Sequence, residues 1–250
     1  MKREIIPTIL VQDRLEFEQR LGIMQGKIPM AQMDIMDGKF VANTTFADPE
    51  IAAHFKVDYE LDLMVENPGP VLDAWKNVPG VKRAFIHAEI KKPLAPLLKK
   101  IKSYGWEAGV ALNPDTEWEV VEPYIGHNPS PTTKRSAALH VPPSGTQGPA
   151  LRNEQSEWHK GLVDCVLFMT VYPGQNGAPF QPKVIPKIAS FHTAYSNIPI
   201  EVDGGVSEQT LPALLKAGVT RFAVGSAIWS APDPLLAYKK LLKITNNSLI

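Results

Sequence analysis

Acidic and amide side chains stand in three short apolar segments of this 250-residue chain. Gln32 and Asp34 belong to the first segment, Asp62 to the second and Asp203 to the third. Alternation along a strand would place Gln32 and Asp34 on one face. An unpaired carboxylate is costly to bury in an apolar strand, so three such strands indicate a shared cation or substrate.

Each of these acids also has an ordinary structural explanation. An aspartate at the end of a strand often caps the following helix or forms a salt bridge. The pairs Asp37-Gly38 and Asp203-Gly204 have the composition of turns. Three acids and an amide on one predicted face are harder to explain in this way, and we interpret them as a functional group.

Glycine-rich segments follow three later apolar runs and are candidates for binding a phosphate. They are Pro173-Gly174 with Gly177, Gly204-Gly205, and Gly225-Ser226. Glycine allows backbone N–H groups to approach an anion closely. A turn would explain each segment alone, but their position after successive predicted strands favours a phosphate site.

These residues require a scaffold that brings strand ends together. Eight short apolar segments alternate with helix-compatible segments, and most begin about 22–34 residues apart, the length of a β-loop-α-loop unit. The predicted strands are residues 5–10, 30–36, 59–64, 83–88, 107–112, 164–171, 198–202 and 221–224. Eight such repeats predict an α/β fold closed into a (β/α)₈ barrel, and an open doubly wound sheet is the alternative.

Helices are predicted in most intervals between the strands. Their ranges are 14–24, 49–55, 68–76, 94–104, 117–124, 182–195 and 208–217. Gly105 and Gly218 follow two of these ranges and would end the helices, whereas Ser207 precedes Glu208 as a candidate N-cap.

The interval between the fifth and sixth strands is about twice as long as the usual unit. Within it, residues 126–160 are rich in Pro, Ser, Thr, Asn and Gly and lack a periodic apolar face. We therefore predict a surface-loop insertion there. Residues 1–250 together are predicted to form a single domain, because α/β barrels of this size form one.

Composition restricts the classes of partner. The 26 basic and 26 acidic residues balance, which argues against nucleic acid or an acidic membrane surface as a partner. The single cysteine, Cys165, excludes an internal disulfide. The sequence has no apolar run of the roughly 18–20 residues that a spanning helix needs, and no signal peptide is evident. The expected location is cytoplasmic, and homo-oligomer formation is left open.

Motifs along nearly all the predicted strands share one resemblance. They lie at residues 6–10, 33–41, 63–68, 86–89, 109–114, 169–174, 201–205 and 225–228. The most specific are Met36-Asp37-Gly38 and Val202-Asp203-Gly204-Gly205 in this order. These motifs resemble those of the ribulose-phosphate 3-epimerase family. The resemblance implies a barrel of the ribulose-phosphate-binding type and an isomerase of the pentose phosphate pathway that acts on a sugar phosphate.

In that family two aspartates on opposite faces of the substrate transfer a proton at C3 of a ketose phosphate. Asp34 and Asp203 match these two catalytic positions. Other residues match the family's substrate cavity, namely Thr8, Met36, Met64, Met169, Gly174, Gly177, Gly204, Gly205, Gly225 and Ser226. For the three methionines, an ordinary place in the core is the alternative.

The chain departs from the family at its metal site. Two histidines and two aspartates bind the metal in the family, whereas the histidine positions here hold Gln32 and Asp62. One divalent ion (Mn, Mg, Fe or Zn) bound by Gln32, Asp34, Asp62 and Asp203 is the predicted cofactor. Such oxygen ligands favour Mn²⁺ or Mg²⁺ over zinc. His87 could replace a lost ligand or serve as a hydrogen-bonded wall residue.

Three functions follow from these residues. An epimerase agrees with both aspartates being present, whereas a non-catalytic sugar-phosphate-binding barrel agrees with the missing histidines. A related lyase needs a lysine three residues before Asp37, and Asp34 stands there instead. Tyr172 occupies a position where the family has asparagine, which alters the predicted phosphate loop. The sequence does not distinguish a pentulose phosphate from a hexulose phosphate.

Overall fold

Eight parallel strands close into a barrel in the computed structural model, which describes residues 2–126, 161–174 and 177–247. Each strand pairs with the next along the chain, and β8 pairs with β1. The strands are β1 (Glu4–Ile9), β2 (Met30–Met36), β3 (Asp58–Met64), β4 (Val81–His87), β5 (Glu107–Leu112), β6 (Cys165–Met169), β7 (Ile200–Asp203) and β8 (Arg221–Val224). The predicted barrel is confirmed, and the alternative of an open sheet is wrong.

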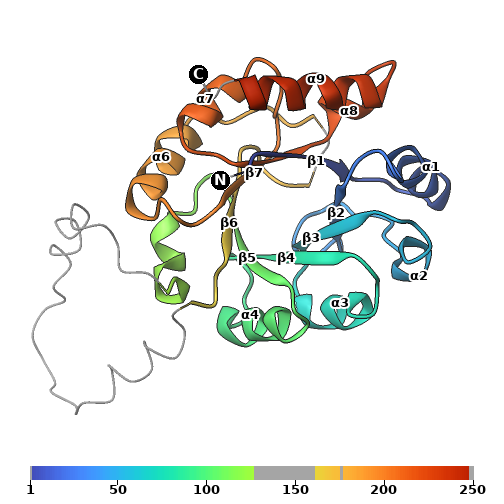
Figure 1. The fold of residues 1–250 in the computed structure, drawn as a ribbon. Coiled ribbons are helices and arrows are strands. Elements are labelled where there is room, and N and C mark those ends of the chain that lie inside the picture. The colour runs from blue at the N-terminus through green and yellow to red at the C-terminus, as the bar shows by residue number, and fades with distance from the viewer. Residues whose placement is uncertain (1, 127–160, 175–176, 248–250) are drawn as a thin grey trace, which may run out of the picture.

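Helices surround the barrel on its outer side (Figure 1). They are α1 (Arg14–Met24), α2 (Pro49–Ala52), α3 (Pro68–Trp75), α4 (Leu94–Ser103), α6 (Val184–Ala194), α7 (Leu211–Lys216), α8 (Ser226–Trp229) and α9 (Pro234–Asn247), together with the 3₁₀ helix η1 (Trp118–Tyr124). Neither α8 nor α9 was among the helices predicted from the sequence. Gly105 and Gly218 follow α4 and α7 with positive φ angles of 79° and 100°, as predicted.

Two predicted helices differ in the structure for local reasons. Residues 117–124 were predicted to be an ordinary helix, but they form η1, whose Pro123 lacks the N–H that an α-helix would use. The predicted helix 208–217 begins at Leu211, because Ser207 and Thr210 form a turn in front of it. The Ser207 side chain therefore does not cap a helix that starts at Glu208.

Apolar side chains form a large shell between the strands and the helices, and a smaller cluster lies inside the barrel. The inner cluster consists of Phe85, Ala111, Cys165, Leu167 and Met169. The barrel is therefore filled by side chains, as in other (β/α)₈ folds.

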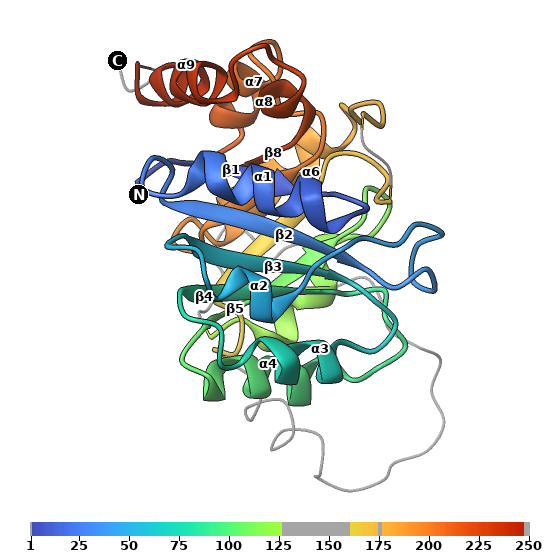
Figure 2. The same cartoon turned by 90° about the vertical axis from the view of Figure 1, so that its right-hand side faces the viewer.

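Charged side chains occupy the barrel interior as well. Arg83 Nη1 lies 2.8 Å from Glu60 Oε2 and 3.1 Å from Glu201 Oε2, and all three side chains are buried. Burial raises the pKa of both glutamates, and their mutual repulsion raises that of Glu60 further. The three residues of this ion cluster lie in the first half of their strands. They are therefore toward the end of the barrel where the N-terminus lies in Figure 2. The carboxyl ends of the strands form the opposite face.

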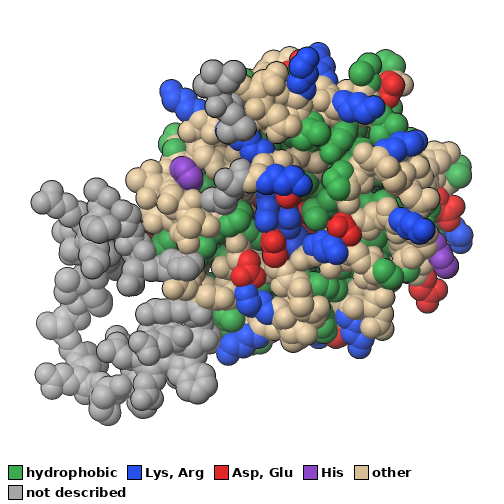
Figure 3. Space-filling view, viewed as in Figure 1, with side chains coloured by type: hydrophobic (Ala, Val, Ile, Leu, Met, Phe, Trp, Pro, Cys, Tyr) green, Lys and Arg blue, Asp and Glu red, His purple; other side chains and the backbone are tan. Residues whose placement is uncertain are grey.

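The surface of the molecule carries both charge signs. On the face in Figure 3, Lys and Arg side chains lie among Asp and Glu side chains, and neither sign forms a large patch among the described residues. Within the described ranges, every helix is too short or too polar to cross a bilayer.

The predicted insertion at 126–160 lies, apart from Gly126, outside the described residues. Its placement on the surface stays a prediction, as does the assignment of residues 1–250 to a single domain. The described chain resumes at Gly161, just before β6.

Close packing inside the barrel leaves no room for a side chain at Gly109. A Cβ atom there would lie 2.2 Å from Phe85 Cδ1, so we expect Gly109→Ala to lower the free energy of unfolding by about 1–3 kcal/mol. Gly22, within α1, has no such neighbour within 4 Å. Gly22→Ala should raise the free energy of unfolding by about 0.5–1 kcal/mol. Urea denaturation measures both, and an unchanged Gly109→Ala protein would contradict this packing.

Candidate metal and proton-transfer site

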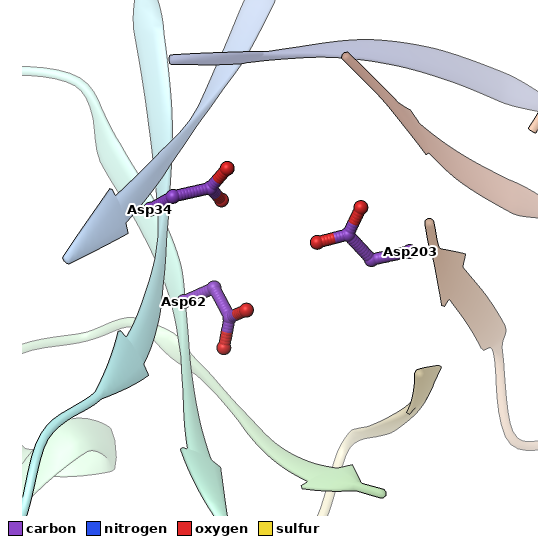
Figure 4. A group of neighbouring side chains, drawn as sticks. All are labelled: Asp34, Asp62 and Asp203. Carbon is purple, nitrogen blue, oxygen red and sulfur yellow. The ribbon is translucent and has the colours of Figure 1, made fainter. Parts of the chain in front are cut away.

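Three buried aspartates converge at the carboxyl ends of the strands. Asp34 and Asp62 lie on the neighbouring strands β2 and β3, and Asp203 ends β7 on the other side of the barrel mouth (Figure 4). One carboxylate oxygen from each lies within 4.8 Å of the others. The β2–β3 register pairs Asp34 with Asp62, and closure of the barrel brings Asp203 to face them.

The Gln32 side chain connects two of these aspartates. Its Nε2 donates to Asp34 Oδ1 at 2.8 Å and to Asp203 Oδ2 at 2.9 Å. The amide oxygen Oε1 is buried and has no hydrogen-bond partner among the described residues. Rotation of the amide about its last bond would exchange the nitrogen and the oxygen, so Gln32 can offer either atom to the centre of the site.

Asp62 is held from outside the group by a histidine. His87 Nε2 lies 3.2 Å from Asp62 Oδ1, and His87 Nδ1 lies 3.5 Å from Glu89 Oε2. Burial alone would lower the pKa of His87, but the two acids outweigh burial and raise it to about 9. The imidazolium therefore orients Asp62 and partly neutralises it, which makes His87 the hydrogen-bonded wall residue rather than a neighbour of Asp34 and Asp203.

Burial and mutual repulsion perturb both predicted catalytic residues. Burial, followed by the charge of Asp62, raises the pKa of Asp34 to about 7, although bonds from Gln32 and Thr8 oppose this rise. Burial and the charges of Asp34 and Asp62 also raise the pKa of Asp203 well above its usual value. Near neutral pH and without a cation, this pair therefore retains a proton.

The structure separates the three converging aspartates from Asp37, which has a structural role. Asp37 Oδ1 accepts from the backbone N–H groups of Lys39 and Phe40, and Oδ2 accepts from that of Glu66. These bonds outweigh partial burial and lower the pKa of Asp37. Asp37-Gly38 is thus turn chemistry, the alternative that the sequence left open, whereas the Asp203 carboxylate faces the site.

One small cavity of about 50 Å³ lies above the aspartates. Asp34 and Asp203 line it, and so do the ten residues predicted to bind substrate, which are Thr8, Met36, Met64, Met169, Gly174, Gly177, Gly204, Gly205, Gly225 and Ser226. Gln32 and Asp62 do not line this cavity. The structure thus gathers the predicted catalytic and substrate-binding residues around one opening, and their individual roles stay predictions.

The donor set fits a hard divalent cation. Three carboxylates lie within ligand range of one another, and two buried oxygens, Asp62 Oδ2 and Gln32 Oε1, lack hydrogen-bond partners among the described residues. Carboxylate and amide oxygens are typical ligands of Mg²⁺, Mn²⁺ and Ca²⁺. The three aspartates could therefore hold a metal ion.

Two threonines that were not predicted from the sequence hold the site in place. Thr45 Oγ1 donates to Asp34 O at 2.6 Å and accepts from Met36 N at 3.0 Å. Thr170 Oγ1 donates to Asp203 O at 2.9 Å. No periodicity marks these side chains, because they bond to backbone groups of other segments.

A model of the ribulose-phosphate 3 epimerase family matches residues 4–128 and 149–229. The chain belongs to the ribulose-phosphate 3-epimerase family. Over 239 residues it is 30% identical to the ribulose-phosphate 3-epimerase of Bacillus subtilis (strain 168), covering 92% of this chain and 94% of that protein. Over 207 residues it is 30% identical to the cytoplasmic isoform of Oryza sativa subsp. japonica, covering 81% and 76%.

Solved structures of other enzymes share the fold of this epimerase-family chain. A 3-hexulose-6-phosphate synthase aligns with a TM-score of 0.56 at 16% identity, over 97% of this chain and 99% of that one. The orotidine 5'-monophosphate decarboxylase of Sulfolobus solfataricus aligns with a TM-score of 0.57 at 11% identity, over the full length of both chains. At these identities the likeness concerns the barrel alone.

The raised pKa of Asp34 predicts how stability depends on pH in the presence of a chelator. An acid whose pKa rises on folding from 3.8 to about 7 stabilises the fold below pH 4 and loses this contribution as the pH rises to 7. One unit of pKa corresponds to about 1.4 kcal/mol. Between pH 4 and 7 the free energy of unfolding of the unaltered chain should therefore fall by on the order of a few kcal/mol because of Asp34, and Asp34→Asn should abolish this decrease. Denaturant titration of both proteins at pH 4.5 and 7 measures this difference, which equal pH profiles would contradict.

Proposed function

We propose that this chain is a ketose-phosphate 3-epimerase in which Asp34 and Asp203 transfer the C3 proton between the two faces of the substrate. The main support is that both carboxylates line one cavity, from opposite sides of the barrel mouth. A proton can be removed on one face and returned on the other only if acid and base approach C3 from both sides.

The electrostatics of the pair suit this exchange. Without a bound cation, burial and repulsion raise the pKa of Asp34 to about 7 and that of Asp203 well above its usual value. One carboxylate can then be ionised as the base while the other is protonated as the acid. The Gln32 amide donates to both carboxylates.

A divalent ion would be held by Asp34, Asp62 and Asp203, with Gln32 as a fourth ligand after rotation of its amide. Such an ion supplies positive charge next to the substrate oxygens at which negative charge develops. We propose Mn²⁺ or Mg²⁺ rather than zinc, because all these donors are oxygen atoms. His87 orients Asp62 through Oδ1, and Oδ2 has no hydrogen-bond partner among the described residues.

The phosphate of the substrate would lie at the carboxyl ends of β6, β7 and β8. Gly177, Gly205, Gly225 and Ser226 line the cavity there, and barrels of this class often bind phosphate after strands seven and eight. A Cβ atom at Gly205 would lie 2.9 Å from Phe180 Cβ. We call these four residues the phosphate rim, and we propose that their backbone N–H groups contact the phosphate.

One observation favours the alternative function of a non-catalytic sugar-phosphate-binding barrel. The Gln32 amide donates to both aspartates, and this arrangement satisfies them without a cation. A member that had lost its metal would keep the cavity and the phosphate rim. The two functions differ in whether bound substrate exchanges its C3 proton with solvent.

We also propose a cytoplasmic location in a reducing compartment. The single cysteine, Cys165, is a free and buried thiol, and the rice relative is named a cytoplasmic isoform. Fractionation of cells that express a tagged chain would test this location.

The two aspartates should be required for exchange of the C3 proton. We expect Asp34→Asn and Asp203→Asn each to lower exchange into a pentulose or hexulose phosphate by about 10²–10⁴-fold, because an amide cannot accept the proton. Proton NMR in D₂O with added Mn²⁺ measures this exchange. Asp37→Asn, in the turn directly after β2, serves as the control. If the unaltered protein binds sugar phosphates but exchanges no proton, the binding barrel becomes the better account.

Asp62 should chiefly determine metal affinity. We expect Asp62→Asn to raise the Kd for Mn²⁺ by about tenfold or more, because it removes one charged ligand from the group. The double variant Gln32→His, Asp62→His should shift preference toward zinc, since imidazole is a softer donor. Calorimetric titration with each ion measures both effects, and identical Mn²⁺ affinity in Asp62→Asn would exclude Asp62 as a ligand.

A further inference from the structure

A second and larger cavity adjoins the catalytic one. Its volume is about 870 Å³, and it shares with the catalytic cavity the wall residues Leu10, Pro173, Gly174 and Ala178. Pockets for small ligands usually have volumes of about 300–1,000 Å³. The catalytic cavity, at about 50 Å³, is far below this range. A sugar phosphate that reaches Asp34 and Asp203 exceeds the small cavity, and the larger one adjoins it along the shared wall.

The larger cavity contains an arginine with unused donors. Arg20, from α1, is the one lysine or arginine among the described residues that line either cavity. Its Nη2 donates to Glu16 Oε1, and its other N–H groups have no hydrogen-bond acceptor among the described residues. A guanidinium offers five N–H donors in a planar fork that matches an anionic oxygen group.

Packing holds this guanidinium in position. Its central carbon lies 4.8 Å from the ring centroid of Trp229, and the Arg20 side chain is only 14% exposed. Trp229 Nε1 in turn donates to Thr8 O at 2.6 Å. Thr8 and Ser226, which begins the short helix that ends in Trp229, both line the catalytic cavity. The cation is thus fixed beside the catalytic cavity. Its positive charge is one of the smaller influences that oppose the raised pKa of Asp34.

We propose that Arg20 binds the phosphoryl group of the substrate from the larger cavity, at the wall that the two cavities share. This assignment rests on the proposed function and adds a side-chain cation to a rim otherwise made of backbone N–H groups. A phosphoryl dianion beside three buried carboxylates needs a compensating charge. Arg20 supplies that charge without approaching the centre of the aspartate group, where a cation of its own would bind.

The ion pair with Glu16 allows this role to be separated from a structural one. Arg20→Gln and Glu16→Gln both break the same pair. If the pair only stabilises α1, the two changes should have similar effects. If Arg20 binds phosphate, Arg20→Gln should weaken binding, whereas Glu16→Gln should preserve or strengthen it by removing a competing acceptor and a repelling charge.

The matched control lies on the same helix. Arg14 forms an equivalent pair with Glu18 four residues away, and its side chain is 68% exposed outside both cavities. Arg14→Gln therefore removes the same charge at a site without the pocket. Arg20→Lys keeps the charge but loses the planar fork, so its effect should lie between those of the unaltered chain and Arg20→Gln.

The test is calorimetric titration of inorganic phosphate into the full chain and these variants, with circular dichroism confirming that each is folded. We expect Arg20→Gln to raise the Kd about tenfold or more, Arg14→Gln to leave it unchanged and Glu16→Gln to leave it unchanged or lower it. Equal affinities of Arg20→Gln and the unaltered chain, equal losses in Arg20→Gln and Glu16→Gln, or no phosphate binding by the unaltered chain would each overturn the proposal.

Phosphate binding is measured without turnover, so this result is independent of the epimerase assay. A chain that binds phosphate through Arg20 but exchanges no C3 proton would refute the proposed function alone. A chain that catalyses exchange with a KM unaffected by Arg20→Gln would refute the role of Arg20 alone.

Discussion

Repulsion among three carboxylates buried at one end of the barrel is the constraint on which the site depends. Asp34, Asp62 and Asp203 place oxygens within 4.8 Å of one another in a place that water barely reaches. In a medium of low dielectric constant, such charges cannot all remain unless something offsets them. The neighbouring side chains offset them in two ways: Gln32 donates to Asp34 and Asp203, and His87 donates to Asp62.

This arrangement explains how a family member can carry an aspartate at position 62 and still balance the charges of the site. The family resemblance places a histidine at the position of Asp62, so Asp62 adds a negative charge relative to that pattern. The imidazolium of His87 next to Asp62 compensates for this charge. Glu89, which faces His87, is itself held by Asn113 N and Thr116 Oγ1. The charge balance is therefore distributed over β3, β4 and the loop after β5.

The rest of the barrel is organised to tolerate polar groups in its interior. At the end near the strand starts, Arg83 lies between Glu60 and Glu201, and apolar residues such as Phe85 and Leu167 lie inside the barrel as a separate cluster. Removing one partner from such a buried pair costs about 3–5 kcal/mol, because the other charge stays behind. The interior thus holds two charged groups, the three aspartates and the cluster around Arg83. Strands β3 and β7 contribute residues to both groups, so substitution on these strands is restricted.

By itself the sequence determined the class of fold and most of the residues of the site. Alternating β and α segments specify a parallel barrel, because each strand must reach its neighbour through a helix on the outside. Asp34, Asp62 and Asp203 were identifiable because a carboxylate in an apolar strand is rare. The glycines of the rim were visible from their positions at strand ends.

Only the tertiary structure decided what these residues contact. β2 and β7 meet across the barrel mouth through closure, so the bridge from Gln32 to Asp203 spans 171 positions in the chain and has no local signal. The same holds for Arg20, which lines a cavity formed by α1 and the loops after β1, β2 and β6. Local rules predict periodic elements well because hydrogen bonds within a helix connect neighbours. Side-chain contacts across a closed barrel depend on every strand between them, and a single sequence does not encode them in any short pattern.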